Sequence, residues 1–199
     1  MAPRSGSSMV AGIFAAHGVW VGKDLRTKNE HNQEGFFEHN YLQRLTCSLF
    51  PGDEGWNEHV PPSMKQAILD KLVATAQADG YISGPWLYKS EAVQFPLWKG
   101  LNPKWVCVRR DADAIFKSSR NSGLVGKRST DEQVRKTIQN NVEKMDYVVE
   151  NLNGVNVYSD EVIDGDMSSL DRAFQYCGLA LDSKKAASCI RPEHWHYRG

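Results

Sequence analysis

The chain has 199 residues, of which 41% are hydrophobic and 24% charged, which is typical of one soluble globular domain over 1–199 and excludes extensive disorder. Its 24 basic and 24 acidic residues cancel, which argues against a dedicated nucleic-acid binder or a membrane-adsorbing protein. The four cysteines, at positions 47, 107, 177 and 189, show neither a disulfide framework nor a zinc-ligand spacing. We therefore expect a cytoplasmic protein with no metal site.

The first part of the chain alternates helices and loops. Met64, Ile68, Leu72 and Ala76 recur every four residues, which is the spacing of one apolar face of a helix. Polar or Gly- and Pro-rich composition marks the loops between helices. The predicted elements are helices over 7–16, 38–49 and 62–78 and loops over 20–35 and 51–62.

The second part alternates strands and helices. Thr130 is the expected cap of the longest helix, and Gly178 is expected to end the last one. The predicted elements are strands over 86–88, 105–108 and 155–158, helices over 111–119, 131–151 and 170–177, and a basic loop over 120–131. This alternation predicts an α/β fold, a parallel sheet with helices on both faces. Such sheets bind ligands at the carboxyl ends of their strands.

The segment Pro3–Ser8 reads Pro-Arg-Ser-Gly-Ser-Ser and leads directly into the first predicted helix. Backbone N–H groups and the positive end of a helix together attract anions, and Gly6 lets the backbone approach a ligand closely. Arg4 adds a planar cation. The glycine spacing and the lysine of a Walker A loop are absent, which argues against a kinase. The alternative interpretation is an ordinary helix capped by a serine.

A second turn follows the strand over 105–108. Arg110 stands at the end of that strand, and Ser118 lies eight residues further, about two turns along the next predicted helix. An arginine and a hydroxyl placed in this way can bind one phosphate. Alternatively, Arg110 forms an ion pair with Asp111 or Asp113 at the start of the helix.

Taken together, the two turns resemble those of the PAPS-dependent sulfotransferase family, PAPS being 3′-phosphoadenosine-5′-phosphosulfate. Pro3–Ser8 is similar to that family's 5′-phosphosulfate loop, in the arginine form found in many bacterial members. The strand that ends at Arg110, with Ser118 after it, is similar to the family's 3′-phosphate site. Further stretches similar to bacterial members follow in the same order, namely Gly35-Phe36-Phe37-Glu38, Trp86–Lys89 with Pro96–Trp98, and Leu170–His196.

The resemblance implies a P-loop-like fold and transfer of a sulfuryl group from PAPS to an acceptor hydroxyl or amine, without a metal and with release of the bisphosphate PAP. A small molecule or a carbohydrate is the expected acceptor. It also implies roles for residues at the matching positions. Arg4 would stabilise the developing charge, and Lys89 would contact the sulfuryl or phosphate group. The expected nucleotide contacts are Arg4, Ser5, Gly6, Ser7 and Ser8 in the cradle, Arg110 and Ser118 at the 3′-phosphate, and Arg191 from the tail.

A general base must accept the proton of the acceptor. Lys89-Ser90-Glu91 stands where animal cytosolic members have Lys-Thr-His, so Glu91 occupies the position of their histidine. Glu38, in the Gly-Phe-Phe-Glu stretch, is an equal candidate. For each carboxylate the alternative is a solvated side chain or an ordinary ion pair.

Two features depart from the family. Many bacterial members read Lys-Asp-Pro-Arg where this chain has Lys89-Ser90-Glu91, and the start of the chain also differs from that of the family. Its members have a hydrophobic strand before the phosphosulfate loop, whereas only Met1 and Ala2 precede Pro3 here. The loss of that strand would expose the edges of its neighbours. The expectation is therefore a truncated start or a fold that closes differently, for example as a homodimer. The alternative functions are a non-catalytic nucleotide-binding or assembly protein and, with less support, a degenerate P-loop kinase.

Overall fold

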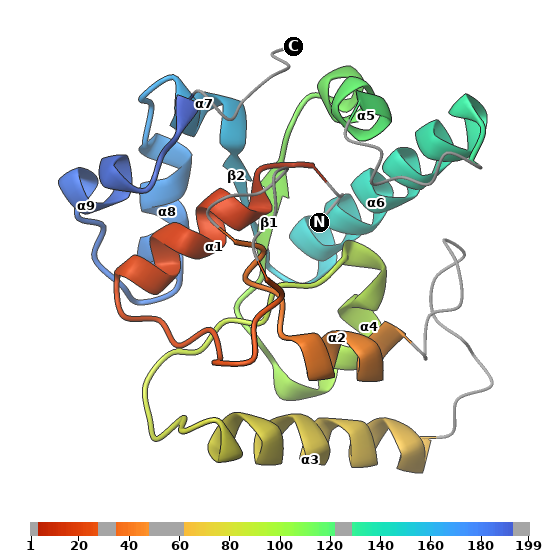
Figure 1. Ribbon diagram of the computed structural model, residues 1–199, viewed down its shortest axis with the longest axis vertical. Coiled ribbons are helices and arrows are strands. Elements are labelled where there is room, and N and C mark those ends of the chain that lie inside the picture. Colours follow the sequence, from red (N-terminus) through yellow and green to blue (C-terminus); the bar gives the residue numbers. More distant parts are fainter. Residues whose placement is uncertain (1–3, 28–34, 48–61, 122–128, 193–199) are drawn as a thin grey trace.

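The computed structural model describes residues 4–27, 35–47, 62–121 and 129–192. Over these ranges the protein is a mixed α/β structure in which helices surround a two-stranded parallel sheet (Figure 1). Of the predicted loop over 51–62 only Pro62 is described, and residues 122–128 of the predicted basic loop and the end of the stretch Leu170–His196 lie outside the described residues. Within the described part, no helix combines the length and apolar composition that crossing a membrane requires.

The two strands are β1 (Val106–Arg109) and β2 (Val155–Tyr158), which pair in parallel with Val106 opposite Val155. The helices of eight residues or more are α1 (Ser7–Ala16), α2 (Asn40–Cys47), α3 (Pro62–Ala78), α5 (Ala112–Asn121), α6 (Asp131–Asn151) and α8 (Ser168–Tyr176). Shorter helices are α4 (Phe95–Trp98), α7 (Ser159–Ile163) and α9 (Ser183–Ser188), and two 3-10 turns cover Ala92–Gln94 and Lys99–Leu101.

Alternating side chains of the strands face two different layers. Val108 and Val157 belong to an apolar cluster with α1 and α8, in which the rings of Phe14 and Phe174 stack with centroids 4.3 Å apart. Cys107 packs instead with α6. Figure 1 shows the sheet between α1, α8 and α9 on one side and α5 and α6 on the other. The predicted flanking of the sheet by helices on both faces is thus confirmed.

A separate apolar cluster lies below the sheet in Figure 1, where α2, α3 and α4 gather. Leu72 of α3 is fully buried there, together with Leu42 of α2 and Leu97 of α4. Trp105, which precedes β1, packs against this cluster and also against the α6 side of the sheet. The lower helices are therefore joined to the sheet through the segment that enters β1.

Helices predicted from apolar spacing are confirmed over 7–16, 62–78 and 131–151, with Thr130 as the cap of α6. The strand predicted over 86–88 is wrong, because only Trp86 makes an isolated parallel bridge, to Trp20. The helix predicted over 38–49 begins at Asn40, and α5 extends to Asn121, into the predicted loop over 120–131. The short helices α7 and α9 were not predicted, because six residues or fewer show no clear period.

Candidate functional site

The first turn of the chain leaves the amino end of α1 open. Gly6 is the residue before the helix, with φ 83°, and within the described residues no side-chain hydrogen bond caps the helix end. Arg4 also has a positive φ, 66°, which is uncommon for a residue with a side chain. The alternative of a serine-capped helix is therefore wrong. An uncapped helix end with a left-handed glycine before it favours a bound anion.

Arg4 joins this turn to the second motif of the sequence. Its Nε donates a hydrogen bond of 2.9 Å to Oγ of Ser118, a buried residue of α5 that lies 114 positions further along the chain. Nη1 of Arg110 donates 3.0 Å to the backbone oxygen of Arg4. Burial lowers the pKa of Arg4. Arg4, Arg110 and Ser118 therefore form one cluster. The first was predicted to bind the 5′-phosphosulfate of a nucleotide and the other two its 3′-phosphate.

Arg110 lies at the end of β1 with only 4% of its side chain exposed. Its Nε is 3.6 Å from Oδ1 of Asp160 in α7. Burial lowers the pKa of Arg110, Asp160 raises it, and the neighbouring charge of Arg4 lowers it further. The predicted pairing with Asp111 or Asp113 is not the main contact, since Asp111 caps α5 through the N–H of Ala114 and Asp113 binds Arg135.

Lys89 forms a second cluster on the other side of the α1 amino end. Its Nζ donates to Oγ of Ser8 (3.0 Å), to the backbone oxygen of Phe36 (2.7 Å) and to Oε1 of Glu38 (2.8 Å). The residue is 6% exposed, so it is not a surface lysine. Burial lowers the pKa of Lys89, and the charge of Glu38 partly offsets that effect. A buried ammonium group thus lies one hydrogen bond away from the first turn.

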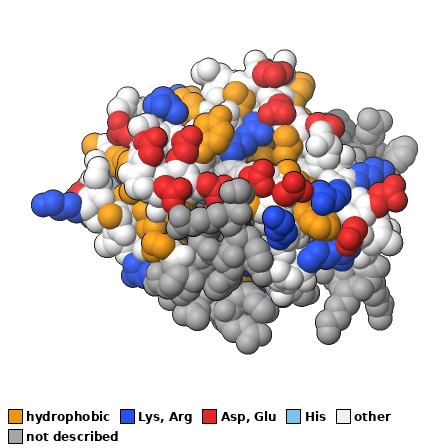
Figure 2. All heavy atoms as spheres, turned by 90° about the horizontal axis from the view of Figure 1, so that it is seen from above, with side chains coloured by type: hydrophobic (Ala, Val, Ile, Leu, Met, Phe, Trp, Pro, Cys, Tyr) orange, Lys and Arg blue, Asp and Glu red, His pale blue; other side chains and the backbone are white. Residues whose placement is uncertain are grey.

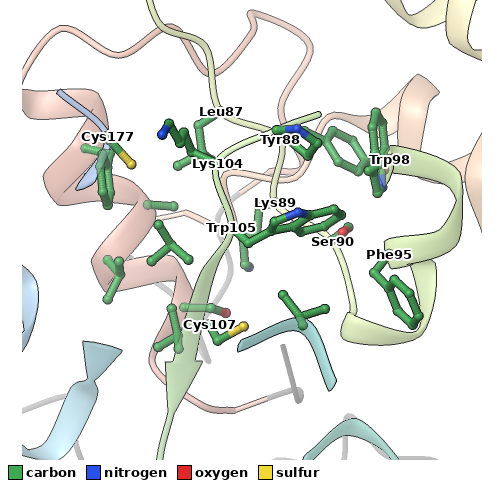
Figure 3. A pocket seen from close by; sticks show the side chains of 18 of the residues that line it. Leu87, Tyr88, Lys89, Ser90, Phe95, Trp98, Lys104, Trp105, Cys107 and Cys177 are labelled. Atoms are coloured by element: carbon green, nitrogen blue, oxygen red, sulfur yellow. The ribbon is translucent and has the colours of Figure 1, made fainter. Parts of the chain in front are cut away.

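The two candidate bases lie near Lys89 in different ways. Glu38 is an ion-pair partner, because its second oxygen also accepts from Nη1 of Arg26 at 3.2 Å. A cavity of about 390 Å³ lies beside β1 (Figure 3), and both Lys89 and Glu91 line it. Glu91 is half-buried there, and its negative charge raises the pKa of Lys89. Both carboxylates therefore belong to the surroundings of one lysine, and Glu38 accepts from two cations.

The other cradle residues are also buried at this place. Ser5 is completely buried, and its Oγ has no hydrogen-bond partner within the described part of the chain. Ser7, 7% exposed, lines the neighbouring cavity. A buried hydroxyl without a partner is costly, because its desolvation is uncompensated. An anion in the turn would supply the missing acceptor.

Arg191 lies elsewhere in the fold. Its Nη1 donates to the backbone oxygens of Ser188 (2.7 Å) and Ile190 (3.0 Å), at the end of α9. These bonds hold the guanidinium against the last turn of that helix. The predicted contact of Arg191 with a nucleotide stays a prediction.

Sequence reasoning missed Asp160 and Arg26. Asp160 stands two residues after β2, at the same sheet edge as Arg110, so the rule that sites lie at strand carboxyl ends could have identified it. Arg26 left no such signal, because it belongs to a polar segment far from any predicted strand.

Figure 2 looks onto the end of the molecule to which both strands point. Basic and acidic side chains are interspersed over the part of this face that is not grey, in keeping with the zero net charge. Among the described residues, no group of three or more His, Cys, Asp or Glu side chains is arranged to hold a metal ion. Comparison with protein-family models, with curated proteins and with solved structures finds no match to this chain.

Proposed function

We propose that the protein is a P-loop-like, PAPS-dependent sulfotransferase. The observation that carries this proposal is the Arg4–Ser118 hydrogen bond with Arg110 on the backbone of Arg4, which joins the two predicted nucleotide-binding turns. The two guanidinium groups lie close enough for the charge of Arg4 to lower the pKa of Arg110. An anion with several oxygens stabilises such an arrangement.

The proposed roles follow from position. The open amino end of α1, with Arg4 and Lys89 on either side, binds the phosphosulfate and stabilises the charge that develops on the leaving phosphate. Arg110 and Ser118 bind the 3′-phosphate, which selects this donor over ATP. The acceptor oxygen or nitrogen bonds to sulfur while the sulfur–oxygen bond to the phosphate breaks, and PAP leaves.

The proton of the acceptor must go to a carboxylate. Both oxygens of Glu38 accept from cations, so Glu38 positions Lys89. We assign the proton to Glu91, which lines the same cavity as Lys89. In this scheme, the lysine stays charged during transfer because Glu38 remains paired with it.

The first test is thermal stabilisation by adenosine 3′,5′-bisphosphate without Mg²⁺. A ligand that binds only the folded state at about 100 times its Kd adds about 2.7 kcal/mol, which raises the Tm of a protein of this size by roughly 5–10 °C. Arg110→Ala should remove most of this shift. Arg109→Ala is the matched control: Arg109 binds Asn156 and Asp146 on the α6 side, so this variant should lose stability yet keep the shift.

Two other results would change the proposal. Stabilisation by Mg²⁺-ATP in place of the bisphosphate would favour a degenerate P-loop kinase. A cooperative transition with no shift for either ligand would favour a non-catalytic assembly protein, because the cluster would then serve structure alone.

A further inference from the structure

The segment that leads to Glu38 bends sharply at Phe37. The φ of Phe37 is 52°, in the left-handed region that residues with a bulky side chain rarely adopt. Glycine adopts this region without strain, whereas an aromatic residue stays there only if its surroundings hold it. The bend at Phe37 therefore requires a contact that fixes it, and α1 supplies one.

The ring of Phe37 lies on the backbone of α1 at Gly12. A Cβ added at Gly12 would lie 3.1 Å from Cζ and 3.2 Å from Cε2 of that ring. These separations are shorter than an ordinary van der Waals contact between carbon atoms, so the ring fits only against a glycine. Gly12 stands inside a helix, where alanine is more favourable by propensity. The reason for a glycine at this position is thus the packing of the ring.

The two neighbours of Phe37 in the chain both bind Lys89. The backbone oxygen of Phe36 accepts from Nζ of Lys89 at 2.7 Å, and Oε1 of Glu38 accepts from the same atom at 2.8 Å. In an extended chain, carbonyl groups and side chains point in roughly perpendicular directions. The left-handed bend between the two ligands lets both reach one ammonium group.

These contacts follow one face of α1. Ser8 lies four residues before Gly12, so the two residues share a face of the helix. Oγ of Ser8 accepts from Nζ of Lys89 at 3.0 Å and lies 3.5 Å from the backbone oxygen of Phe36. The ring of Phe37 rests one turn further along, on Gly12. The helix therefore holds the ammonium group directly, through the hydroxyl, and indirectly, through the bend.

Arg26 fixes the residues on either side of the bend. Its guanidinium lies 4.3 Å from the centre of the Phe36 ring, and its backbone N–H donates 2.7 Å to the backbone oxygen of Glu38. With both neighbours fixed in this way, the conformation of Phe37 decides whether they face Lys89 together.

We propose that Gly12 and Phe37 are positioning residues that act on the proposed reaction through Lys89. The ring seated on Gly12 holds the left-handed bend, and the bend holds a carbonyl oxygen and a carboxylate on the buried ammonium group. The lysine thereby stays paired beside the first turn of α1. Only the effect on the nucleotide rests on the proposed sulfotransferase function.

The first test observes the ammonium group of Lys89 by lysine Nζ NMR, with Lys89→Met to identify its signal. The protons of a buried, hydrogen-bonded ammonium group exchange slowly with water. Gly12→Ala should raise their exchange rate about ten-fold or more, because the added Cβ displaces the ring and with it both ligands. Gly100→Ala is the matched control and should leave the rate unchanged, since a Cβ there would lie 3.7 Å from Leu69, an ordinary contact.

Phe37→Gly keeps the test decisive if Gly12→Ala does not fold. It adds no atom and adopts a φ of 52° without strain, but it removes the ring from its seat. This variant should also raise the exchange rate of Lys89. Gly12→Ala added to Phe37→Gly should have no further effect, because no ring remains to be displaced. An unchanged rate in the folded variants, or an equal effect of Gly12→Ala with and without the ring, would overturn the proposal.

A second arm measures the Kd of adenosine 3′,5′-bisphosphate. Gly12→Ala should weaken binding about ten-fold, the loss expected for one hydrogen bond to a charged group. In the Lys89→Met background the same change should have an effect of less than about two-fold, because it acts through the lysine. Equal losses in both backgrounds would overturn the action through Lys89. If the wild type binds no bisphosphate, the proposed function fails, whereas the NMR arm still decides the positioning role.

Discussion

At the scale of single residues, the site depends on a few side chains that reach across the chain. Ser118 accepts from Arg4, and Ser8 and Glu38 accept from Lys89. Each acceptor satisfies a cation that is largely removed from water, where an unpaired charge would be strongly unfavourable. Arg4 immediately precedes the turn into α1, and Lys89 bonds to Ser8 in the first turn of α1, so both cations lie near the amino end of this helix.

The assignment of the proton acceptor predicts different effects for two isosteric changes. Glu91→Gln should reduce kcat about 100-fold or more with little change in PAP affinity, since general-base catalysis contributes about 10²–10⁴-fold. Glu38→Gln should weaken PAP binding and raise the KM for the donor, because Lys89 loses its charged partner. Steady-state kinetics with PAP titration measure both effects. Equal effects of the two variants on kcat and binding would contradict the assignment.

At the scale of elements, helix amino ends gather at one edge of the sheet. α5 and α7 each follow a strand, and α1 follows the Arg4–Gly6 turn. α6 runs along the other face and contributes Met145 and Val148 to the packing there. The position of α6 therefore determines how well the sheet and its cavity are covered.

The cap of α6 can be tested separately from the site. Oγ1 of Thr130 accepts from the N–H of Gln133, and Oε1 of Gln133 accepts from the N–H of Thr130. Thr130→Ala should therefore destabilise the protein by about 1 kcal/mol, with a fall in Tm of roughly 2–4 °C. Thr137→Ala, inside the same helix, is the control and should be near neutral, because alanine favours a helix interior. Urea unfolding measures both, and equal losses would contradict the capping role.

At the scale of the whole molecule, the site lies where two apolar clusters meet. Arg110 follows β1 of the sheet. Lys89 belongs to a segment whose Tyr88 packs against the cluster formed by α2, α3 and α4. The end of α3 is tied to the site segment by Asp79, which accepts 2.8 Å from Nε2 of His39, next to Glu38. Separation of the two clusters would therefore disrupt the Lys89 cluster.

This tie predicts an acid-dependent stability. Burial alone would raise the pKa of Asp79, but hydrogen bonds from His39 and from the backbone of Lys23 outweigh it and lower that pKa. The stabilisation is therefore complete above the unfolded pKa of about 4, and it is lost as the pH falls through the lower folded value. Asp79→Asn should lower the Tm at pH 6. The difference in Tm between this variant and the wild type should shrink below pH 4. Asp70→Asn, on α3, is the control, and a pH-independent difference for Asp79→Asn would contradict the linkage.

The sequence by itself determined the features that depend on local chemistry. Apolar spacing was sufficient for α1, α3 and α6, and short runs between turn residues predicted β1 and β2 to within one residue. The positive φ of Gly6 and the cap at Thr130 follow from the properties of those residue types. Arg4, Arg110 and Ser118 could be selected in advance because each belongs to a short motif at a predicted turn, whereas Lys89 was selected from the family resemblance.

Only the tertiary structure decided which of these groups meet. The bond between Arg4 and Ser118, the burial of Lys89 and the second cation on Glu38 involve residues that no local pattern relates. Segment 86–88 shows the same limit. Its composition suits a strand, yet regular pairing also requires an extended neighbour in register, and Trp86 makes only an isolated bridge, to Trp20. Sheet formation depends on partners distant in sequence, whereas a helix satisfies its own backbone.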